Sequence, residues 1–150
     1  MKKEILIIDN FLDEKEIGWL LSYFKDFNNE VEKFRDTNVL QITGQIKPLE
    51  EKFNKMAKTH AVDWLQIVEW PENSYQDLHQ DDTSKRTTAT SITYLNDGFA
   101  GGETYFEDGT IIKPRPGRTV FFDGQYYKHG VNKVTEGVRY TVPVWYTKLW

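Results

Sequence analysis

Three residues of this 150-residue chain have the types and spacing of a metal site: His79, Asp81 and His129. His79 and Asp81 lie two residues apart, so an extended backbone would point both side chains to the same face. Two imidazoles and one carboxylate can hold Fe(II) and leave coordination positions open for a co-substrate and oxygen. A hydrated surface loop over residues 80–85 is the alternative, because a chain with 23 acidic residues also forms His-x-Asp pairs by chance.

Arg139 is the next residue whose type and position suggest chemistry. It follows the distal histidine by ten residues, and the turn signal Glu136-Gly137 between them predicts that the two lie on neighbouring strands. Arg139, Thr141 and Trp145 share one parity of the last predicted strand, which we assign to the barrel interior. A buried guanidinium is costly unless an anion pairs with it, and its planar fork suits a carboxylate. A structural salt bridge is the alternative.

Two helices are predicted in the first half of the chain. Asp13 and Glu16 form an acidic capping box, and apolar residues with helical spacing follow as far as Phe27. A second helix is predicted to begin at Pro48, a residue favoured in the first helical turn. The stretch around Val39–Ile42 is ambiguous and is a candidate short strand.

Short β-rich runs separated by Gly, Pro and Asn turn signals make up the rest of the chain. The runs are Trp64–Trp70, Thr87–Leu95, Glu103–Phe106, Thr110–Lys113, Arg118–Phe122 and Val138–Leu149. This pattern predicts an α+β, mainly β fold: a double-stranded β-helix (jelly roll) with supporting N-terminal helices. We expect one domain over residues 1–150, with a helical lead-in over 1–62 and the jelly-roll core over about 63–150. Pro143 inside the last run predicts an edge position or a bulge.

Composition excludes several classes of protein. The chain has no cysteine, which rules out a disulfide framework and a thiolate zinc site, and its net charge of -4 disfavours a nucleic-acid partner. The apolar run Ile5–Ile8 is too short for a signal peptide or a membrane span, so we expect a cytoplasmic protein without a membrane partner. The third histidine, His60, is expected at a helix end or on the surface. The oligomeric state stays open.

Several further motifs occur in an order that is typical of one family. They are His79-Gln-Asp81, Thr93–Asp97, Gly101–Phe106, Lys113–Arg118 leading into Val120-Phe121-Phe122, and His129-Gly130-Val131 followed by Gly137–Tyr140. Together they resemble the 2-oxoglutarate- and Fe(II)-dependent dioxygenases, specifically the prolyl-hydroxylase-like branch. The resemblance covers about residues 64–147.

The resemblance implies roles for individual residues. His79, Asp81 and His129 would hold Fe(II), and 2-oxoglutarate would chelate the metal through its C1 carboxylate and keto oxygen. Arg139 would pair with the C5 carboxylate, and Tyr94 matches a tyrosine that hydrogen-bonds the same carboxylate in relatives. A core aromatic is the alternative interpretation of Tyr94.

Other positions match the family less closely. Thr141 corresponds to a small hydroxyl residue found in some branches, and Trp145 is expected either to line the substrate mouth or to pack in the core. Relatives commonly have a tyrosine three residues before the first histidine, whereas here Gln76 stands there and Tyr75 comes one place earlier. Collagen-type prolyl hydroxylases usually carry lysine where Arg139 stands, so the final strand looks more like that of the oxygen-sensing prolyl hydroxylases.

The resemblance also implies a reaction. It couples oxidative decarboxylation of 2-oxoglutarate, with O2, to hydroxylation of a substrate C–H bond, and releases succinate and CO2; ascorbate is a candidate reductant. A peptidyl proline, hydroxylated as by the prolyl 4-hydroxylases, is the first candidate substrate, which implies a peptide or protein partner. Another amino-acid residue or a small molecule is the alternative substrate. A metal-binding jelly-roll module without turnover, or a structural β-sandwich whose histidines are incidental, is the alternative function.

Overall fold

The computed structural model describes residues 4–81 and 87–149 of the chain. Its elements in chain order are β1 (Leu6–Ile8), α1 (Glu14–Asp26), the 3-10 helix η1 (Asn28–Glu30), β2 (Glu32–Phe34), β3 (Thr37–Gln41), α2 (Lys47–Ala57), β4 (His60–Trp70), β5 (Gln76–His79), β6 (Thr87–Tyr94), β7 (Ala100–Gly101), β8 (Thr104–Phe106), β9 (Ile111–Ile112), β10 (Thr119–Phe122), β11 (His129–Val131), β12 (Val134–Glu136) and β13 (Arg139–Lys148). Every strand predicted after residue 63 is present, with its ends shifted by up to four residues.

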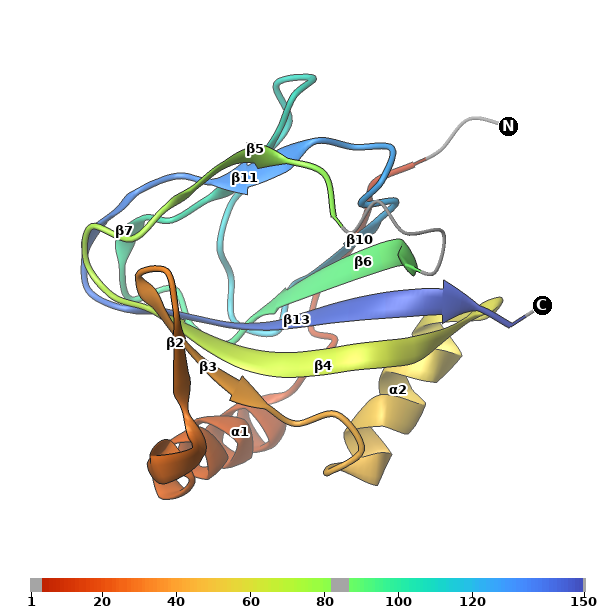
Figure 1. Ribbon diagram of the computed structural model, residues 1–150, viewed down its shortest axis with the longest axis horizontal. Helices are drawn as coiled ribbons and strands as arrows, with labels where there is room; N and C mark the ends of the chain where they lie inside the picture. Colours follow the sequence, from red (N-terminus) through yellow and green to blue (C-terminus); the bar gives the residue numbers. More distant parts are fainter. Residues whose placement is uncertain (1–3, 82–86, 150) are drawn as a thin grey trace.

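Two antiparallel sheets face each other, as Figure 1 shows. The larger has the strand order β1-β10-β6-β13-β4-β3-β2, the smaller has the order β5-β11-β8-β9, and β7 and β12 form a separate pair. Apolar side chains from both sheets meet between them: Ile92, Tyr94, Phe106, Ile112, Val120 and Phe122. The predicted jelly roll, mainly β with N-terminal helices, is confirmed.

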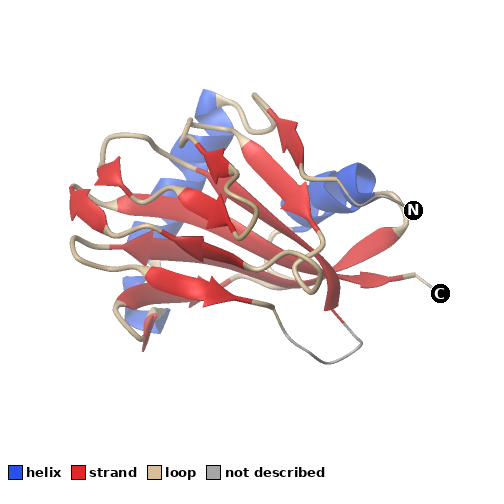
Figure 2. Ribbon diagram, turned by 90° about the horizontal axis from the view of Figure 1, so that it is seen from above, coloured by secondary structure: helices blue, strands red, loops and turns tan. Residues whose placement is uncertain are grey.

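The two helices cover the outer face of the larger sheet (Figures 1 and 2). The predicted capping box begins α1: the Asp13 carboxylate accepts from the Glu16 N–H, and the Glu16 carboxylate accepts from the Asp13 N–H. Helix α2 begins at Lys47 with Pro48 in its first turn, as predicted to within one residue. None of the helices in the described ranges is long and apolar enough to cross a membrane.

Strand β13 lies between the helix layer and the barrel interior, and its side chains point alternately to one and the other. Val142, Val144 and Tyr146 are fully buried in the core that contains the helix residues Leu20 and Phe53. The residues of the other parity, beginning with Arg139, point between the two sheets and line a cavity there. The predicted assignment of the two parities is therefore confirmed.

The lead-in is less helical than predicted. Besides its two helices, it supplies β1 at one edge of the larger sheet and the β2–β3 hairpin at the other. Strand β1 pairs with β10, more than a hundred residues away, and β3 pairs with β4. The strands β1 and β2 are only three residues long, too short to show a clear period of two in the sequence.

The edge position predicted for Pro143 is wrong, because β13 lies in the middle of the larger sheet, between β6 and β4. The register shift that β13 does have against β4 lies at Trp145/Tyr146, two residues beyond the proline. Pro143 keeps its pairing with Ile92 of β6. The pairs with β4 are interrupted at Val142 and Pro143 and resume at Val144. Proline has no N–H to donate, so a break on one side of the strand is the physical cost of placing it there.

Candidate metal centre and co-substrate pocket

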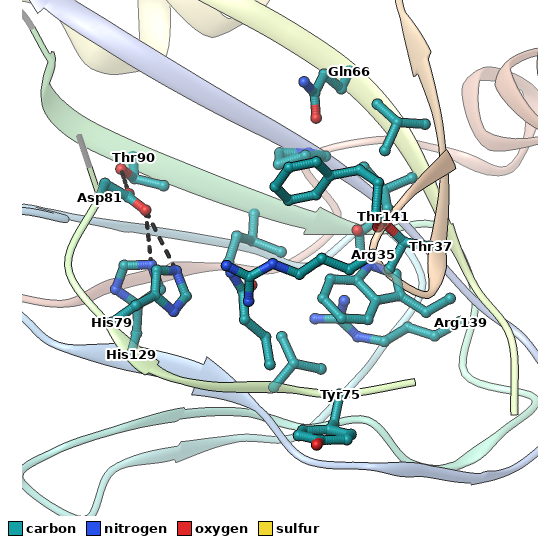
Figure 3. Close-up of a pocket in the computed structure, with 18 of the residues that line it drawn as sticks. Arg35, Thr37, Gln66, Tyr75, His79, Asp81, Thr90, His129, Arg139 and Thr141 are labelled. Carbon is teal, nitrogen blue, oxygen red and sulfur yellow. Dashed lines mark hydrogen bonds and ion pairs between the residues drawn. The ribbon is translucent and has the colours of Figure 1, made fainter. Parts of the chain in front are cut away.

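The three predicted metal-site residues come together at the end of β5. His79 lies directly opposite His129 in the antiparallel pairing of β5 with β11, and Asp81 follows β5 by two residues. The Asp81 Oδ1 atom is 3.6 Å from His79 Nε2 and 3.2 Å from His129 Nε2, as Figure 3 shows. One ligand atom from each residue lies within 4.8 Å of the others. Residues 82–86, which include most of the alternative surface loop, lie outside the described residues.

Backbone contacts orient both imidazoles in the same way. Nδ1 of His79 lies 2.9 Å from the Asp77 carbonyl oxygen, and Nδ1 of His129 lies 2.9 Å from the Tyr127 carbonyl oxygen. A carbonyl oxygen only accepts, so Nδ1 carries the proton in each ring and the Nε2 lone pair is left for a metal. Each ring therefore presents Nε2, and not Nδ1, as the atom that a metal would bind.

Asp81 is held by the strand opposite and by a close backbone approach. Its backbone N–H donates to the Gly124 carbonyl at 3.0 Å, and its carboxylate accepts from the Thr90 hydroxyl of β6. A Cβ at Gly124 would collide with both the Asp81 carboxylate and the Thr90 hydroxyl. Only glycine fits at this position, so the loop before His129 is shaped around the carboxylate.

The electrostatics of the centre favour an ionised carboxylate. Burial opposes ionisation of Asp81, but hydrogen bonds with His129 and His79 outweigh it and hold the pKa of this carboxyl well below its usual range. Burial disfavours the cation of His79, but the hydrogen bonds with the Asp81 carboxylate and the Asp77 carbonyl, together with the charge of Asp81, outweigh burial and raise the pKa of this imidazole. The donor set is thus one anionic oxygen and two imidazole nitrogens, which fits a divalent iron ion.

Arg139 faces this centre across a cavity of about 320 Å³ that both line. The two histidine strands belong to the smaller sheet and β13 belongs to the larger one, so the predicted neighbouring strands for His129 and Arg139 are wrong. Between them the chain forms β12, which pairs with β7, before it crosses to the larger sheet. The turn signal at Glu136-Gly137 thus marks a crossover between sheets and not a hairpin.

Arg139 has no anionic partner in the described part of the chain. Its side chain is 1% exposed, and one Nη donates to the Thr104 hydroxyl at 3.1 Å. Its guanidinium carbon lies 4.9 Å from the ring centre of Trp70 and 5.3 Å from that of Tyr94. Burial lowers the pKa of Arg139, which is the sign of an uncompensated cation.

Two buried hydrogen-bond donors lack an acceptor at the Arg139 end of the cavity. Among the side chains of residues 4–81 and 89–149, the only buried nitrogen or oxygen atoms without a hydrogen-bond partner are Arg139 Nε and Trp70 Nε1. Both residues line the cavity, and they lie opposite each other in the pairing of β13 with β4. An unsatisfied buried donor costs about 1–3 kcal/mol, more when charged. A bound carboxylate would satisfy both donors, so the pocket fits 2-oxoglutarate.

Tyr94 and Thr141 differ in their relation to the cavity. Thr141 lines it, whereas Tyr94 is fully buried behind it, with its hydroxyl 2.5 Å from the Thr104 hydroxyl. The predicted contact of Tyr94 with the C5 carboxylate therefore stays a prediction. Thr104, which sequence reasoning did not single out, joins Tyr94 to Arg139 and holds the guanidinium in place.

The mouth of the cavity combines predicted and unpredicted residues. Tyr75, Gln76 and Trp145 all line it. Arg35 also lines it, from the turn between β2 and β3, where it has a positive φ of 56° (Figure 3). The sequence contained little signal for Arg35, because β2 was not predicted. His60 lies apart from the site, at the start of β4.

Comparison with known proteins agrees with this geometry. A family model described as the 2OG-Fe(II) oxygenase superfamily matches residues 65–147. Human prolyl 3-hydroxylase 2 is 38% identical over 65 residues, which cover 39% of this chain and 9% of that protein. The match thus spans about a tenth of the length of that curated relative.

Solved structures share the fold at low sequence identity. A viral collagen prolyl hydroxylase from Paramecium Bursaria Chlorella virus-1 is 21% identical with a TM-score of 0.79, covering 97% of this chain and 96% of that one. A prolyl hydroxylase in complex with a hypoxia inducible factor peptide fragment, from Trichoplax adhaerens, is 17% identical with a TM-score of 0.80, covering 96% and 83%. The expected resemblance to the prolyl-hydroxylase-like branch is confirmed, and the chain belongs to the 2OG-Fe(II) oxygenase superfamily.

Proposed function

We propose that this chain is an Fe(II)- and 2-oxoglutarate-dependent dioxygenase that hydroxylates a prolyl residue in a peptide or protein. The observation that carries the proposal is the position of the buried, unpaired Arg139 across one cavity from the His79, Asp81 and His129 centre. A module that only binds a metal has no need for a buried cation without a counter-ion. An oxygenase with a dicarboxylate co-substrate does.

Each part of the cavity has a definite task in this proposal. Bound Fe(II) supplies the O2 chemistry that couples decarboxylation of 2-oxoglutarate to hydroxylation of a C–H bond. Asp81 and the two imidazoles would hold the metal. Arg139 and Trp70 would donate to a carboxylate of 2-oxoglutarate and orient it. Apolar walls that include Ile92 and Val131 exclude water from the reaction.

The choice of proline rests on the relatives. The curated relatives with significant similarity to the chain include prolyl 3-hydroxylases of human, rat, mouse and chicken, at 37–38% identity over 65 residues. One structure with the same fold carries a bound peptide fragment. Comparison of the product with 3- and 4-hydroxyproline standards distinguishes C3 from C4 of the ring, and omission of ascorbate tests its role as reductant.

The test is aerobic conversion of 2-oxoglutarate to succinate by the purified protein with Fe(II) and ascorbate, with and without a pool of proline-containing peptides. We expect peptide-stimulated succinate formation and a hydroxyl-sized mass gain on the peptide, neither of which His129→Ala supports. Succinate formation that no peptide stimulates would redirect the substrate to another residue or a small molecule. Iron binding without any succinate would favour a metal-binding module and overturn the proposal.

A further inference from the structure

A second depression adjoins the cavity on the open side of the larger sheet. We name it the acidic groove; it has a volume of about 860 Å³ and is lined by Glu30, Glu32, Lys33, Phe34, Val39, Leu40, Gln41, Asp63, Trp64, Gln66 and Trp145. The groove is formed by the β2–β3 hairpin, the start of β4 and the residue Trp145 of β13.

The acidic groove is continuous with the cavity that holds the metal centre. Phe34, Val39, Gln66 and Trp145 line both. Trp145 is the link: it lies opposite Thr90, whose hydroxyl donates to the Asp81 carboxylate, and on its other side it lies opposite Trp64. The row Trp64, Trp145 and Thr90 therefore leads from the groove toward the metal centre.

The walls of the groove are exposed aromatic rings. Phe34 is 60% exposed and Trp64 is 48% exposed, while Trp145 is half-buried between the two depressions. Large apolar side chains left in contact with solvent beside a reactive centre mark a surface that a partner covers. Aromatic grooves of this kind suit an extended polypeptide, and proline-rich segments are pre-organised for them.

The charge changes sign between the two depressions. Among the described residues, the cavity is lined by Arg35 and Arg139 and by one acidic residue, Asp81, which the metal would neutralise. In the same part of the chain, Glu30 and Glu32 line the acidic groove on the side of the hairpin, and Lys33 is the basic residue of its lining. The field of the groove therefore repels a dianion such as 2-oxoglutarate and attracts a cation. This charge difference favours 2-oxoglutarate in the cavity and a positively charged second substrate in the groove.

We propose that the acidic groove binds a basic, extended segment of the substrate polypeptide next to the residue that is hydroxylated. This inference rests on the proposed function and narrows its substrate class to polypeptides with Lys or Arg flanking the target. Phe34, Trp64 and Trp145 contact the backbone and apolar parts of the segment, and Glu30 and Glu32 attract its positive charge.

The test compares three fluorescent peptides that share one central proline and differ only in flanking residues: lysine, alanine or glutamate. Their dissociation constants are measured by fluorescence anisotropy on the protein loaded with Fe(II) and 2-oxoglutarate under nitrogen, where no turnover occurs. At low salt we expect the dissociation constant of the lysine peptide to be at least about fivefold lower than that of the alanine peptide, which is the effect of one or two exposed ion pairs. The glutamate peptide is expected to bind most weakly. Added salt should reduce the differences among the three dissociation constants, because it screens exposed charges.

Charge-reversal variants locate the effect. Glu32→Lys combined with Glu30→Lys is expected to remove or invert the preference among the peptides and to leave the 2-oxoglutarate affinity unchanged. Glu51→Lys, an exposed charge reversal on α2, is the matched control for each of the two reversals made singly, and it keeps the preference. Equal binding of the three peptides, or a preference that survives the double reversal, overturns the inference.

Turnover in air separates this inference from the proposed function. If the lysine peptide binds in the predicted way but gains no hydroxyl, the proposed function fails and the docking surface stands. If peptides are hydroxylated regardless of flanking charge, the proposed function stands and the acidic groove is not the binding surface.

Discussion

His79 and His129 face each other directly across two antiparallel strands, with their ring centres 4.4 Å apart. They come from β5 and β11, about 50 residues apart in the sequence. A one-residue slip of this pairing would turn one imidazole to the other face of the sheet. The centre therefore depends on one cross-strand register, together with the short path from His79 to Asp81.

Removing a ligand should abolish metal binding without unfolding the protein. We expect His129→Ala to weaken Fe(II) binding by more than about 100-fold, which exceeds the usual effect of an outer-shell partner. The measurement is the rise in melting temperature on anaerobic addition of Fe(II), which reports binding to the native state. His60→Ala is the matched control, since His60 lies outside the site. A wild-type rise in His129→Ala would refute the ligand assignment.

The hydroxyl of Thr90 should matter to the metal although it is not a ligand. It donates to the Asp81 carboxylate, so Thr90→Val is expected to weaken metal affinity by roughly tenfold. Thr93→Val is the control: it removes a buried hydroxyl from the same strand, where Thr93 bonds Thr119 at 2.6 Å. Titration calorimetry with a divalent metal would compare the two variants. Equal losses in both would show that Thr90 acts only through stability.

Arg139 should have opposite effects on binding and on folding. We expect Arg139→Met to weaken 2-oxoglutarate binding by about 100-fold or more, because the loss of one partner of a buried charge pair costs about 3–5 kcal/mol. Without 2-oxoglutarate the same variant should be as stable as the wild type or more stable, since an unpaired buried cation has been replaced by an apolar chain. Calorimetric binding and urea unfolding measure the two effects. Unchanged 2-oxoglutarate affinity would refute the role of Arg139.

Trp70 should contribute through its N–H and not only through its ring. Trp70→Phe keeps an aromatic face near the Arg139 guanidinium but removes the orphaned donor. We expect 2-oxoglutarate to bind about tenfold more weakly, as for the loss of one hydrogen bond of about 1.5 kcal/mol to a charged group. Trp64→Phe on the same strand, with an exposed ring, should keep the wild-type affinity. Equal dissociation constants for Trp70→Phe and wild type would exclude the N–H contact.

Tyr140 should make the stability of the larger sheet sensitive to alkaline pH. Burial, and then the hydrogen bond that its hydroxyl donates to Glu69 at 2.6 Å, raises the pKa of Tyr140 to about 12. The native state holds this proton more tightly than the unfolded chain, where tyrosine has a pKa of about 10. The contribution is therefore complete below pH 10 and is lost as the pH rises from about 10 to 12.

Urea unfolding of wild type and Tyr140→Phe across this pH range tests the assignment. Below pH 10 the variant should be less stable by about 1 kcal/mol, the value of one hydrogen bond, and this difference should shrink as the pH rises above 10. A difference in free energy of unfolding that stays constant with pH would contradict it.

Local spacing was enough to predict several parts of this protein. The capping box of Asp13 and Glu16 and the alternation along β13 follow from the periods of a helix and a strand, which are properties of neighbouring residues. The pair of His79 and Asp81, with His129 farther on, was also visible as a set of ligand types. These three residues meet in space because of the register in which β5 pairs with β11.

Other features were decided only by the tertiary structure. The position of Arg139 across the cavity from His129 depends on a crossover between sheets, which a turn signal cannot distinguish from a hairpin. Thr90, Thr104 and Trp70 matter because of what lies opposite them in the fold, and their residue types carry no such signal in the sequence. Short-range patterns report which face a side chain takes, whereas the partner on that face is set by long-range pairing and packing.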